Sequence, residues 1–387
     1  MRRVMILAGL LVLTGSAGLG LLAQGGSKED RVERLMEEYT NAPGPSGDEE
    51  AVRDLVVRDL HSAGAEVSID GMGSVIGVVR GTSDRPRIMV DAHMDEVSLM
   101  VQYIRPDGFI AFKTLSYPDP WLSDKRWVIL TNKGPVFGLT GARDVHVWPA
   151  DERARGVPRE EIVLDVGATS KEEAEQLGIR PGDLIAPVSP FMVMSHQRYA
   201  AKAWDDRVGL LVMVEALRKL KAGGARLPNS IYFVATTQEE LGMRGARVAV
   251  DTVKPDLGIA LEPGIAGDVP GVSPDRAQEH LGSGPAIFLS DTSMIPNRKL
   301  AEFFLSVAKD KQIPLQTEVL SGGYSEDGSE IQRYGTGRPS ILLTVPARYT
   351  HAHTSVIDRH DFDGAVDLLT EILTRLDAGT AEEISRF

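Results

Sequence analysis

The stretch RIMVDAHMDE, residues 87–96, decides the fold because it joins an apolar strand to polar residues at the strand's carboxyl end. Alternate side chains of a strand point to the same side, so His93 and Asp95 are expected to lie together. Open α/β sheets place their functional sites at the carboxyl ends of strands. The stretch therefore predicts an α/β fold with a site at this strand end. Taken alone, a strand-end His beside a capping Asp is the better explanation of this pattern.

Three further apolar runs end in the same way. They are IYFVATTQEE (231–240) with Glu239 and Glu240, LGIALEP (257–263) with Glu262, and ILLTVPARYTH (341–351) with His351. A further acid, Asp205, opens a long amphipathic helix in AKAWDDRVGLLVMVEAL (201–217). Each position has an ordinary structural explanation, such as the preference for acids at a helix start. Their repetition at strand ends and a helix start predicts a two-metal hydrolytic centre.

Two pairs within this set leave alternatives open. His351 and His353 both follow the apolar strand on the same side, so either is a candidate ligand. Glu239 and Glu240 can face one cavity from a turn, one binding a metal while its neighbour takes a proton from water.

Local signals predict where two of the elements begin and end. Ser46 followed by Glu49 is typical of a capping box at a helix start. Pro263 comes directly after Glu262, which predicts that the strand stops there.

Bulk composition excludes several classes of function. The chain has 387 residues, which favours two domains over one small core. It has no cysteine, which excludes disulfides, thiolate catalysis and Cys-ligated zinc. A net charge of −13 without a basic stretch argues against nucleic acid as a partner.

The chain changes character along its length. Residues 1–27 hold two arginines and then a long apolar run, which is the pattern of an export leader and predicts a periplasmic or extracellular protein. An uncleaved membrane anchor is the alternative, because about 20 apolar residues span a bilayer. Residues 28–96 and 191–387 have α/β character, whereas 97–190 consist of short β-rich pieces separated by turns. We therefore expect an α/β domain with a small barrel or sandwich inserted after the strand that carries His93.

Seven motifs, in this order and at this spacing, resemble one known family: PGPSGDEE (43–50), HMDEVSLMV (93–101), IVLDVGATSKEEAEQLGIRPGD (162–183), KAWDDRVG (202–209), QEELGMRGA (238–246), HLGSGPAI (280–287) and ARYTHAH (347–353). The chain resembles the TET-type dinuclear-metal aminopeptidases, which include glutamyl and deblocking aminopeptidases and are sometimes labelled endoglucanase-type. The resemblance runs from about Leu35 to Phe387. It implies a zinc-exopeptidase-like catalytic domain, with a mixed sheet flanked by helices, an inserted small β-barrel domain, and assembly into a homo-oligomer.

The family pattern also implies roles for these residues. Two divalent ions, Zn²⁺ or Co²⁺, would share Asp205 as a bridge, one held by His93 and Glu262 and the other by Glu240 and His351. The pattern makes Glu239 the general base and gives Asp95 a catalytic role beside His93. Its RYxH motif selects His351 over His353.

One departure from the family lies near the expected substrate region. The usual Gly-Gly-Thr-Asp is replaced by GGYSED (322–327), in which Asp327 keeps its distance from the RYxH motif. The resemblance therefore does not extend to substrate preference.

The expected function is metal-dependent removal of N-terminal residues from peptides through a water activated by two metals. A glycoside hydrolase of endoglucanase type is one alternative, since paired carboxylates also serve that chemistry without metals. A non-catalytic binding protein on a peptidase scaffold is another.

Overall fold

A computed structural model describes residues 30–147, 149, 157–320 and 322–386. The predicted export leader or membrane anchor, residues 1–27, lies outside the described residues. None of the helices within these ranges combines the length and the apolar character that crossing a bilayer requires.

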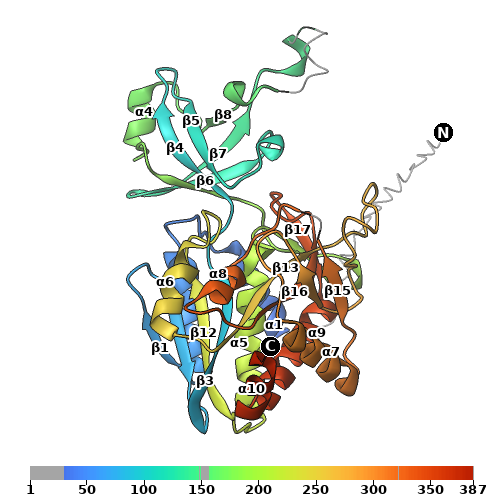
Figure 1. The fold of residues 1–387 in the computed structure, drawn as a ribbon. Coiled ribbons are helices and arrows are strands. Elements are labelled where there is room, and N and C mark those ends of the chain that lie inside the picture. The colour runs from blue at the N-terminus through green and yellow to red at the C-terminus, as the bar shows by residue number, and fades with distance from the viewer. Residues whose placement is uncertain (1–29, 148, 150–156, 321, 387) are drawn as a thin grey trace, which may run out of the picture.

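A mixed sheet of eleven strands forms the centre of the α/β part (Figure 1). Its main path runs β1 (Glu66–Ile69), β2 (Val75–Val79), β12 (Asn229–Thr236), β3 (Ser83–His93), β13 (Leu257–Ile265), β16 (Ser340–Arg348), β17 (Ser355–Asp358), β11 (Arg198–Ala201) and β10 (Met192–Val193). Strand β14 (Ala286–Ser290) joins β16, and β15 (Gln316–Val319) joins β14. The four central strands β12, β3, β13 and β16 are parallel. Their near-continuous apolar runs fit strands that are buried on both faces.

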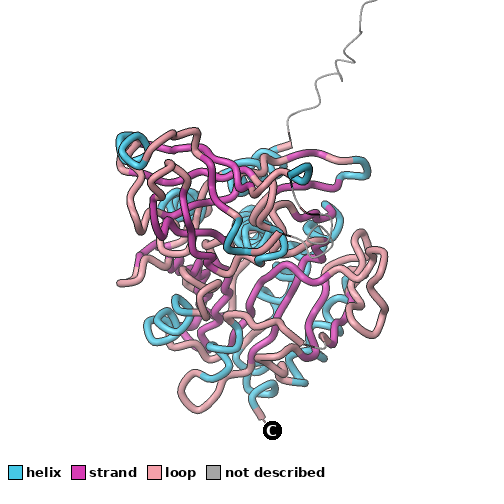
Figure 2. The backbone as a smooth tube through the Cα atoms, turned by 90° about the horizontal axis from the view of Figure 1, so that it is seen from above, coloured by secondary structure: helices cyan, strands magenta, loops and turns pink. Residues whose placement is uncertain are grey.

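Helices cover both faces of this sheet (Figure 2). One face packs against α1 (Arg31–Asn41), α2 (Glu50–Ser62), α5 (Trp204–Ala222), α7 (Arg298–Lys311) and α9 (Arg359–Arg375). The other face packs against α6 (Arg244–Val253) and α8 (Gly328–Arg333), and α10 (Ala378–Ser385) closes the chain beside α7. Helix α5 is buried almost all round, as expected for a helix between a sheet and an outer layer. The predicted α/β class is therefore confirmed.

The β-rich segment between β3 and β10 forms a closed six-stranded barrel, which confirms the predicted inserted barrel. Its strands are β4 (Ser98–Ile104), β5 (Ile110–Leu115), β6 (Arg126–Thr131), β7 (Gly134–Gly141), β8 (Val163–Asp165) and β9 (Leu184–Pro187). The segment also holds helix α4 (Lys171–Gln176) and the short helical turns Asp119–Trp121, Val145–Val147 and Arg159–Glu161. A separate core around Trp127 and Ile129 fills the barrel. Because the insertion leaves the sheet directly after His93, the barrel stands over the carboxyl end of β3 (Figure 1).

The predicted capping box at Ser46 and Glu49 is wrong. Helix α2 begins at Glu50 without a side-chain cap. The Ser46 hydroxyl donates instead to Asp95, at 2.6 Å. The Ser46 hydroxyl therefore bonds to a residue distant in sequence and not to the backbone of the helix start.

The prediction that β13 stops before Pro263 is also wrong, because β13 continues to Ile265 alongside β16. The N–H groups of Gly258 and Ala266 donate to carbonyls of residues 339 and 347, on the side of β16. Because successive N–H groups of a strand point to opposite sides, the backbone nitrogens of odd-numbered β13 residues, including Pro263, face β3. Pairing with β3 has already ended at Ala260. The missing N–H of Pro263 therefore costs no ladder hydrogen bond.

Candidate metal centre

Parallel register brings the predicted site residues to one edge of the sheet. His93, the last residue of β3, lies opposite Thr236, the last residue of β12. On the other side β3 pairs with β13 up to Ala260, two residues before Glu262. Strands that are far apart in sequence therefore end side by side, as expected for the carboxyl edge of an α/β sheet.

Two groups of potential metal ligands share one carboxylate. The first is His93, Asp205 and Glu262, and the second is Asp205, Glu240 and His351; within each group the donor atoms all lie within 4.8 Å of one another. Asp205 Oδ1 lies 2.9 Å from His93 Nε2, and Asp205 Oδ2 lies 3.0 Å from His351 Nε2. Each oxygen of Asp205 therefore faces a different group, which is the arrangement that a bridging carboxylate requires.

The remaining acids divide between these groups. Glu262 Oε2 lies 3.7 Å from His93 Nε2, and Glu240 Oε2 lies 3.7 Å from His351 Nε2. Glu239 belongs to neither group, although its Oε2 lies 4.0 Å from His93 Nε2. The adjacent acids Glu239 and Glu240 thus occupy different places at the same edge.

Asp95 organises the backbone beneath the cluster. Its carboxylate accepts hydrogen bonds from the N–H groups of Glu239 (2.9 Å) and Glu240 (3.2 Å) and from the Ser46 hydroxyl. His93 Nδ1 lies 3.1 Å from the Asp95 carbonyl, which can only accept, so Nδ1 carries the proton. Nε2 of His93 is therefore left free to act as a ligand on the side of Asp205.

Asp206 ties the start of α5 to the end of β3. Its carboxylate accepts from the N–H groups of His93 (3.1 Å) and Gly209 (2.9 Å), and the peptide bond between Asp205 and Asp206 is cis. The bond to Gly209 caps the helix locally, whereas the contact with His93 joins residues 113 apart and no local sequence signal predicts it.

The charges of the cluster demand a cation. Burial, opposed by His351 and assisted by repulsion from Asp205, raises the pKa of Glu240 to about 8. Burial and then repulsion from Asp206 raise the pKa of Glu262 well above its usual value. One buried oxygen of Glu240 also has no hydrogen-bond partner among the described residues. Oxygen and imidazole donors with this excess of negative charge fit divalent metal ions.

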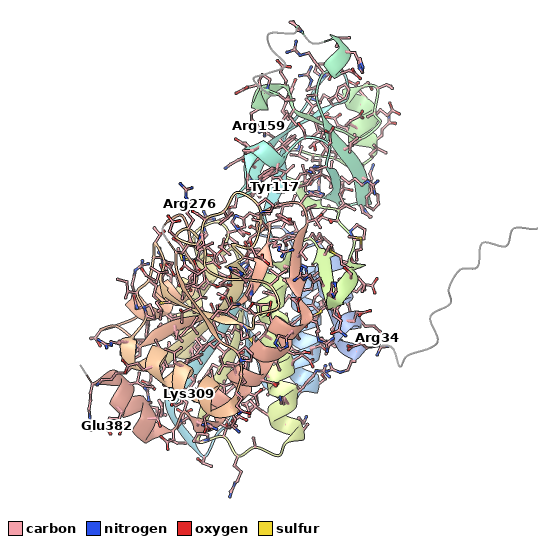
Figure 3. All side chains as sticks on the ribbon, turned by 90° about the vertical axis from the view of Figure 1, so that its right-hand side faces the viewer. Arg34, Tyr117, Arg159, Arg276, Lys309 and Glu382 are labelled. Carbon is pink, nitrogen blue, oxygen red and sulfur yellow. The ribbon has the colours of Figure 1, made fainter. Side chains whose placement is uncertain are left out.

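His353 lies outside the cluster and contacts residues of the barrel. Its Nδ1 lies 3.2 Å from the hydroxyl of Tyr117, and its ring packs edge-on against Trp127 with 5.1 Å between centroids. Tyr117 marks the junction between the barrel and the α/β part in Figure 3. Burial lowers the pKa of His353 to about 4, so the ring is neutral at this junction. Of the two candidate histidines, only His351 reaches the acids.

Asp327 is buried behind the cluster. It accepts a hydrogen bond from the Thr236 hydroxyl, and burial raises the pKa of its carboxyl to about 6. Its neighbour Glu326 is also fully buried, which its local sequence does not predict. The only signal was that GGYSED departs from the family pattern.

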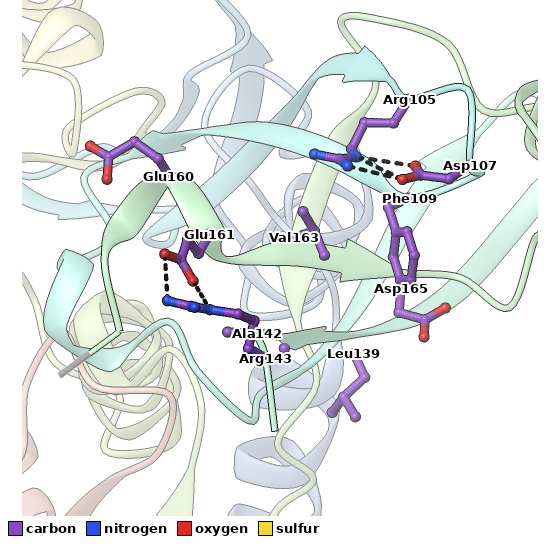
Figure 4. A pocket seen from close by; sticks show the side chains of 11 residues that line it. Arg105, Asp107, Phe109, Leu139, Ala142, Arg143, Glu160, Glu161, Val163 and Asp165 are labelled. Carbon is purple, nitrogen blue, oxygen red and sulfur yellow. Dashed lines mark hydrogen bonds and ion pairs between the residues drawn. The ribbon is translucent and has the colours of Figure 1, made fainter. Parts of the chain in front are cut away.

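A cavity of about 710 Å³ lies elsewhere, on the outside of the barrel (Figure 4). Its lining includes the ion pairs Arg105–Asp107 and Arg143–Glu161, in which the acids are already neutralised. None of the candidate ligands lines it. The size of this cavity therefore does not mark it as the reactive site.

Comparison with known proteins places this geometry in a family. The family model described as M42 glutamyl aminopeptidase matches residues 73–368. The lysyl aminopeptidase of Pyrococcus furiosus is 35% identical over 349 residues, covering 88% of this chain and 96% of the relative. The structure of a TET aminopeptidase from a marine sediment archaeon of the Thaumarchaeota is 40% identical, with a TM-score of 0.89 over 93% of this chain and 100% of the other. The TET1 peptidase of Pyrococcus horikoshii, which can assemble into a tetrahedron or a large octahedral shell, is 29% identical, with a TM-score of 0.80 over 89% of this chain and 100% of the other.

Proposed function

The chain belongs to the M42 glutamyl aminopeptidase family and is a metallo-aminopeptidase, and we propose that it removes N-terminal residues from peptides at a two-metal centre. The observation that carries the proposal is the position of Asp205, whose two oxygens face His93 and His351 separately. His93 and Glu262 would hold one ion, and Glu240 and His351 the other. Zinc or cobalt suits these imidazole and carboxylate donors.

The two ions, when bound, supply Lewis acidity that polarises the scissile carbonyl and acidifies water. Glu239 is the general base in this proposal, because it lies beside the ligands without belonging to either group. Burial raises the pKa of its carboxyl well above the usual value, and repulsion from Asp327 and Glu240 adds to this. A carboxylate with a raised pKa is a stronger base, so it takes a proton from water more readily, and its acid form can then give that proton to the leaving amine.

Asp95 acts as a positioning residue. Its carboxylate holds the backbone of both Glu239 and Glu240, so one side chain sets the spacing between the base and a metal ligand. Its carbonyl also fixes the tautomer of His93.

Membership of an aminopeptidase family does not favour the two alternative functions, glycoside hydrolysis and non-catalytic binding. A metal-independent glycosidase would also leave His93 and His351 without a role. The family does not decide which N-terminal residue is preferred, because its members include both glutamyl and lysyl enzymes.

Metal removal tests the proposal directly. We expect dialysis against a chelator to abolish cleavage of leucine p-nitroanilide, and added Zn²⁺ or Co²⁺ to restore it at two ions per subunit. Elemental analysis by plasma mass spectrometry gives the stoichiometry, and release of p-nitroaniline gives the rate. Full activity in protein shown to be metal-free, or activity on glucans that survives chelation, would contradict the proposal.

We also propose that the chain forms a homo-oligomer, as its structural relative TET1 does. The expected result is a mass several times the 41.9 kDa of one chain in size-exclusion chromatography with light scattering. A monomer at micromolar concentration would contradict it.

A further inference from the structure

Two loops pack against each other beside the candidate metal centre. Residues 291–295 follow β14, and residues 322–327 precede α8. The Thr292 N–H donates to the Tyr324 carbonyl at 3.1 Å, and the Tyr324 N–H donates back to the Thr292 hydroxyl at 3.3 Å. These two hydrogen bonds fix the position of one loop relative to the other.

Each loop contributes a carboxylate that lacks a cation. Glu326 is fully buried; one oxygen accepts from the Gly328 N–H, and the other has no hydrogen-bond partner among the described residues. One carboxylate oxygen of Asp291 accepts hydrogen bonds from Ser293 and Met294. Its other oxygen is buried and has no hydrogen-bond partner among the residues that the structure describes.

The two carboxylates repel each other. Burial raises the pKa of Glu326 well above its usual value, and Asp291 is the largest charged contributor to that rise. The charge of Arg333 lowers the pKa of Glu326. The Arg333 guanidinium donates its hydrogen bonds to Ser329, Glu330 and the Ser293 carbonyl, however, and not to Glu326. A buried carboxylate without a partner costs folding free energy, so a cation from outside the protein would be bound favourably.

Tyr324 connects this acid pair with the metal centre. Its hydroxyl donates to the carbonyl of Pro263 at 2.8 Å, directly after the ligand Glu262, and its ring packs against Phe288. Burial raises the pKa of Tyr324, and the charges that raise it further include Glu262, Asp205 and Glu326. The hydroxyl therefore lies beside the metal-ligand cluster, and Tyr324 comes two residues before Glu326 in the same loop.

We propose that Glu326, assisted by Asp291, is a specificity-determining residue that receives the cationic side chain of a basic N-terminal residue, lysine or arginine. This inference rests on the proposed aminopeptidase function. A substrate ammonium or guanidinium pairs with both carboxylates and halves their net negative charge, whereas an acidic N-terminal residue adds a third negative charge. A leucine side chain fills space but leaves both carboxylates unpaired.

The test compares the cobalt-loaded or zinc-loaded full chain with its Glu326→Gln variant on the p-nitroanilides of lysine, arginine, leucine and glutamate. We expect the wild type to prefer lysine and arginine, and the variant to lose about 30-fold or more of the lysine-to-leucine ratio of kcat/KM. Glu318→Gln is the matched control, because Glu318 is also buried with one unpartnered oxygen but lies on the edge strand β15. The control is expected to keep the wild-type ratio.

The outcomes separate this inference from the proposed function. A metal-loaded wild type that cleaves none of the four substrates contradicts the aminopeptidase proposal itself. A wild type that cleaves leucine but prefers glutamate, or a Glu326→Gln variant that keeps the lysine-to-leucine ratio, overturns the inference alone. If Glu326→Gln does not fold, as judged by thermal melting, Asp291→Asn is expected to lower the same ratio, and an unchanged ratio there overturns the inference.

Discussion

Replacing Glu239 by Gln is expected to leave two metal ions bound and to lower kcat by about 100-fold or more. Glu239 lies outside both ligand groups, so an amide of the same size does not disturb the metals. The amide cannot accept a proton, and the loss corresponds to about 2.7 kcal/mol of transition-state stabilisation. Metal content by plasma mass spectrometry and initial rates on a chromogenic substrate give the two numbers.

The neighbouring variant Glu240→Gln is the matched control, with the opposite expectation. Glu240 Oε2 lies 3.7 Å from His351 Nε2, and its other oxygen is buried without a partner among the described residues. We expect this variant to lose metal as well as activity. If Glu239→Gln kept its turnover, or lost metal as Glu240→Gln is expected to, the roles of the two acids would have to be exchanged or abandoned.

Asp205→Asn is expected to have a still larger effect, with metal content falling below two ions per subunit and turnover falling by about 1000-fold. The carboxylate faces His93 with one oxygen and His351 with the other. An amide replaces one of these oxygens by an NH₂ group, which donates and does not ligate. Both ions therefore lose a shared negative ligand in a single substitution.

Asp367→Asn, an exposed change on α9, provides the control for Asp205→Asn. Asp367 pairs with Lys219 of α5, so the substitution also removes one charge beside this helix, but away from its active end. Metal content and rate are expected to match the wild type. Two tightly bound ions in Asp205→Asn at full turnover would rule out a bridging role for this residue.

Much of the site was predictable because its residues are marked by position in their own segments. His93 ends the buried strand β3, Glu262 lies near the end of β13, and His351 follows β16, and strand alternation with the carboxyl-edge rule brings such residues together. An inserted β-rich unit was predictable because short strands separated by turns cannot continue a doubly covered sheet, whereas the choice of a barrel over a sandwich came from the family resemblance. The assignment of individual ligands came from the family resemblance and not from periodicity.

What could not be predicted depends on contacts between distant segments. The Ser46 hydroxyl donates to Asp95, 49 residues away, instead of capping the helix that follows it, and no local motif predicts that partner. Pro263 is tolerated inside β13 only because β3 has stopped pairing before it, which is a property of register. His353 and His351 follow the same strand on the same side, so the sequence does not distinguish them by position. His353 contacts Tyr117 and Trp127 of the barrel, and it therefore lies at the junction between the two parts.

The amino-acid sequence by itself determined the fold class, the inserted barrel and the set of residues that end at one edge of the sheet. Hydrophobic patterning is local, and it dictates which strands are buried and where they end. Only the tertiary structure decided that the two oxygens of Asp205 face different histidines, that Asp95 supports two adjacent acids, and that Glu326 and Asp291 are buried without a cation. Hydrogen-bond partners, burial and the electrostatic cost of a charge depend on neighbours supplied by other segments, so they exist only once the chain has folded.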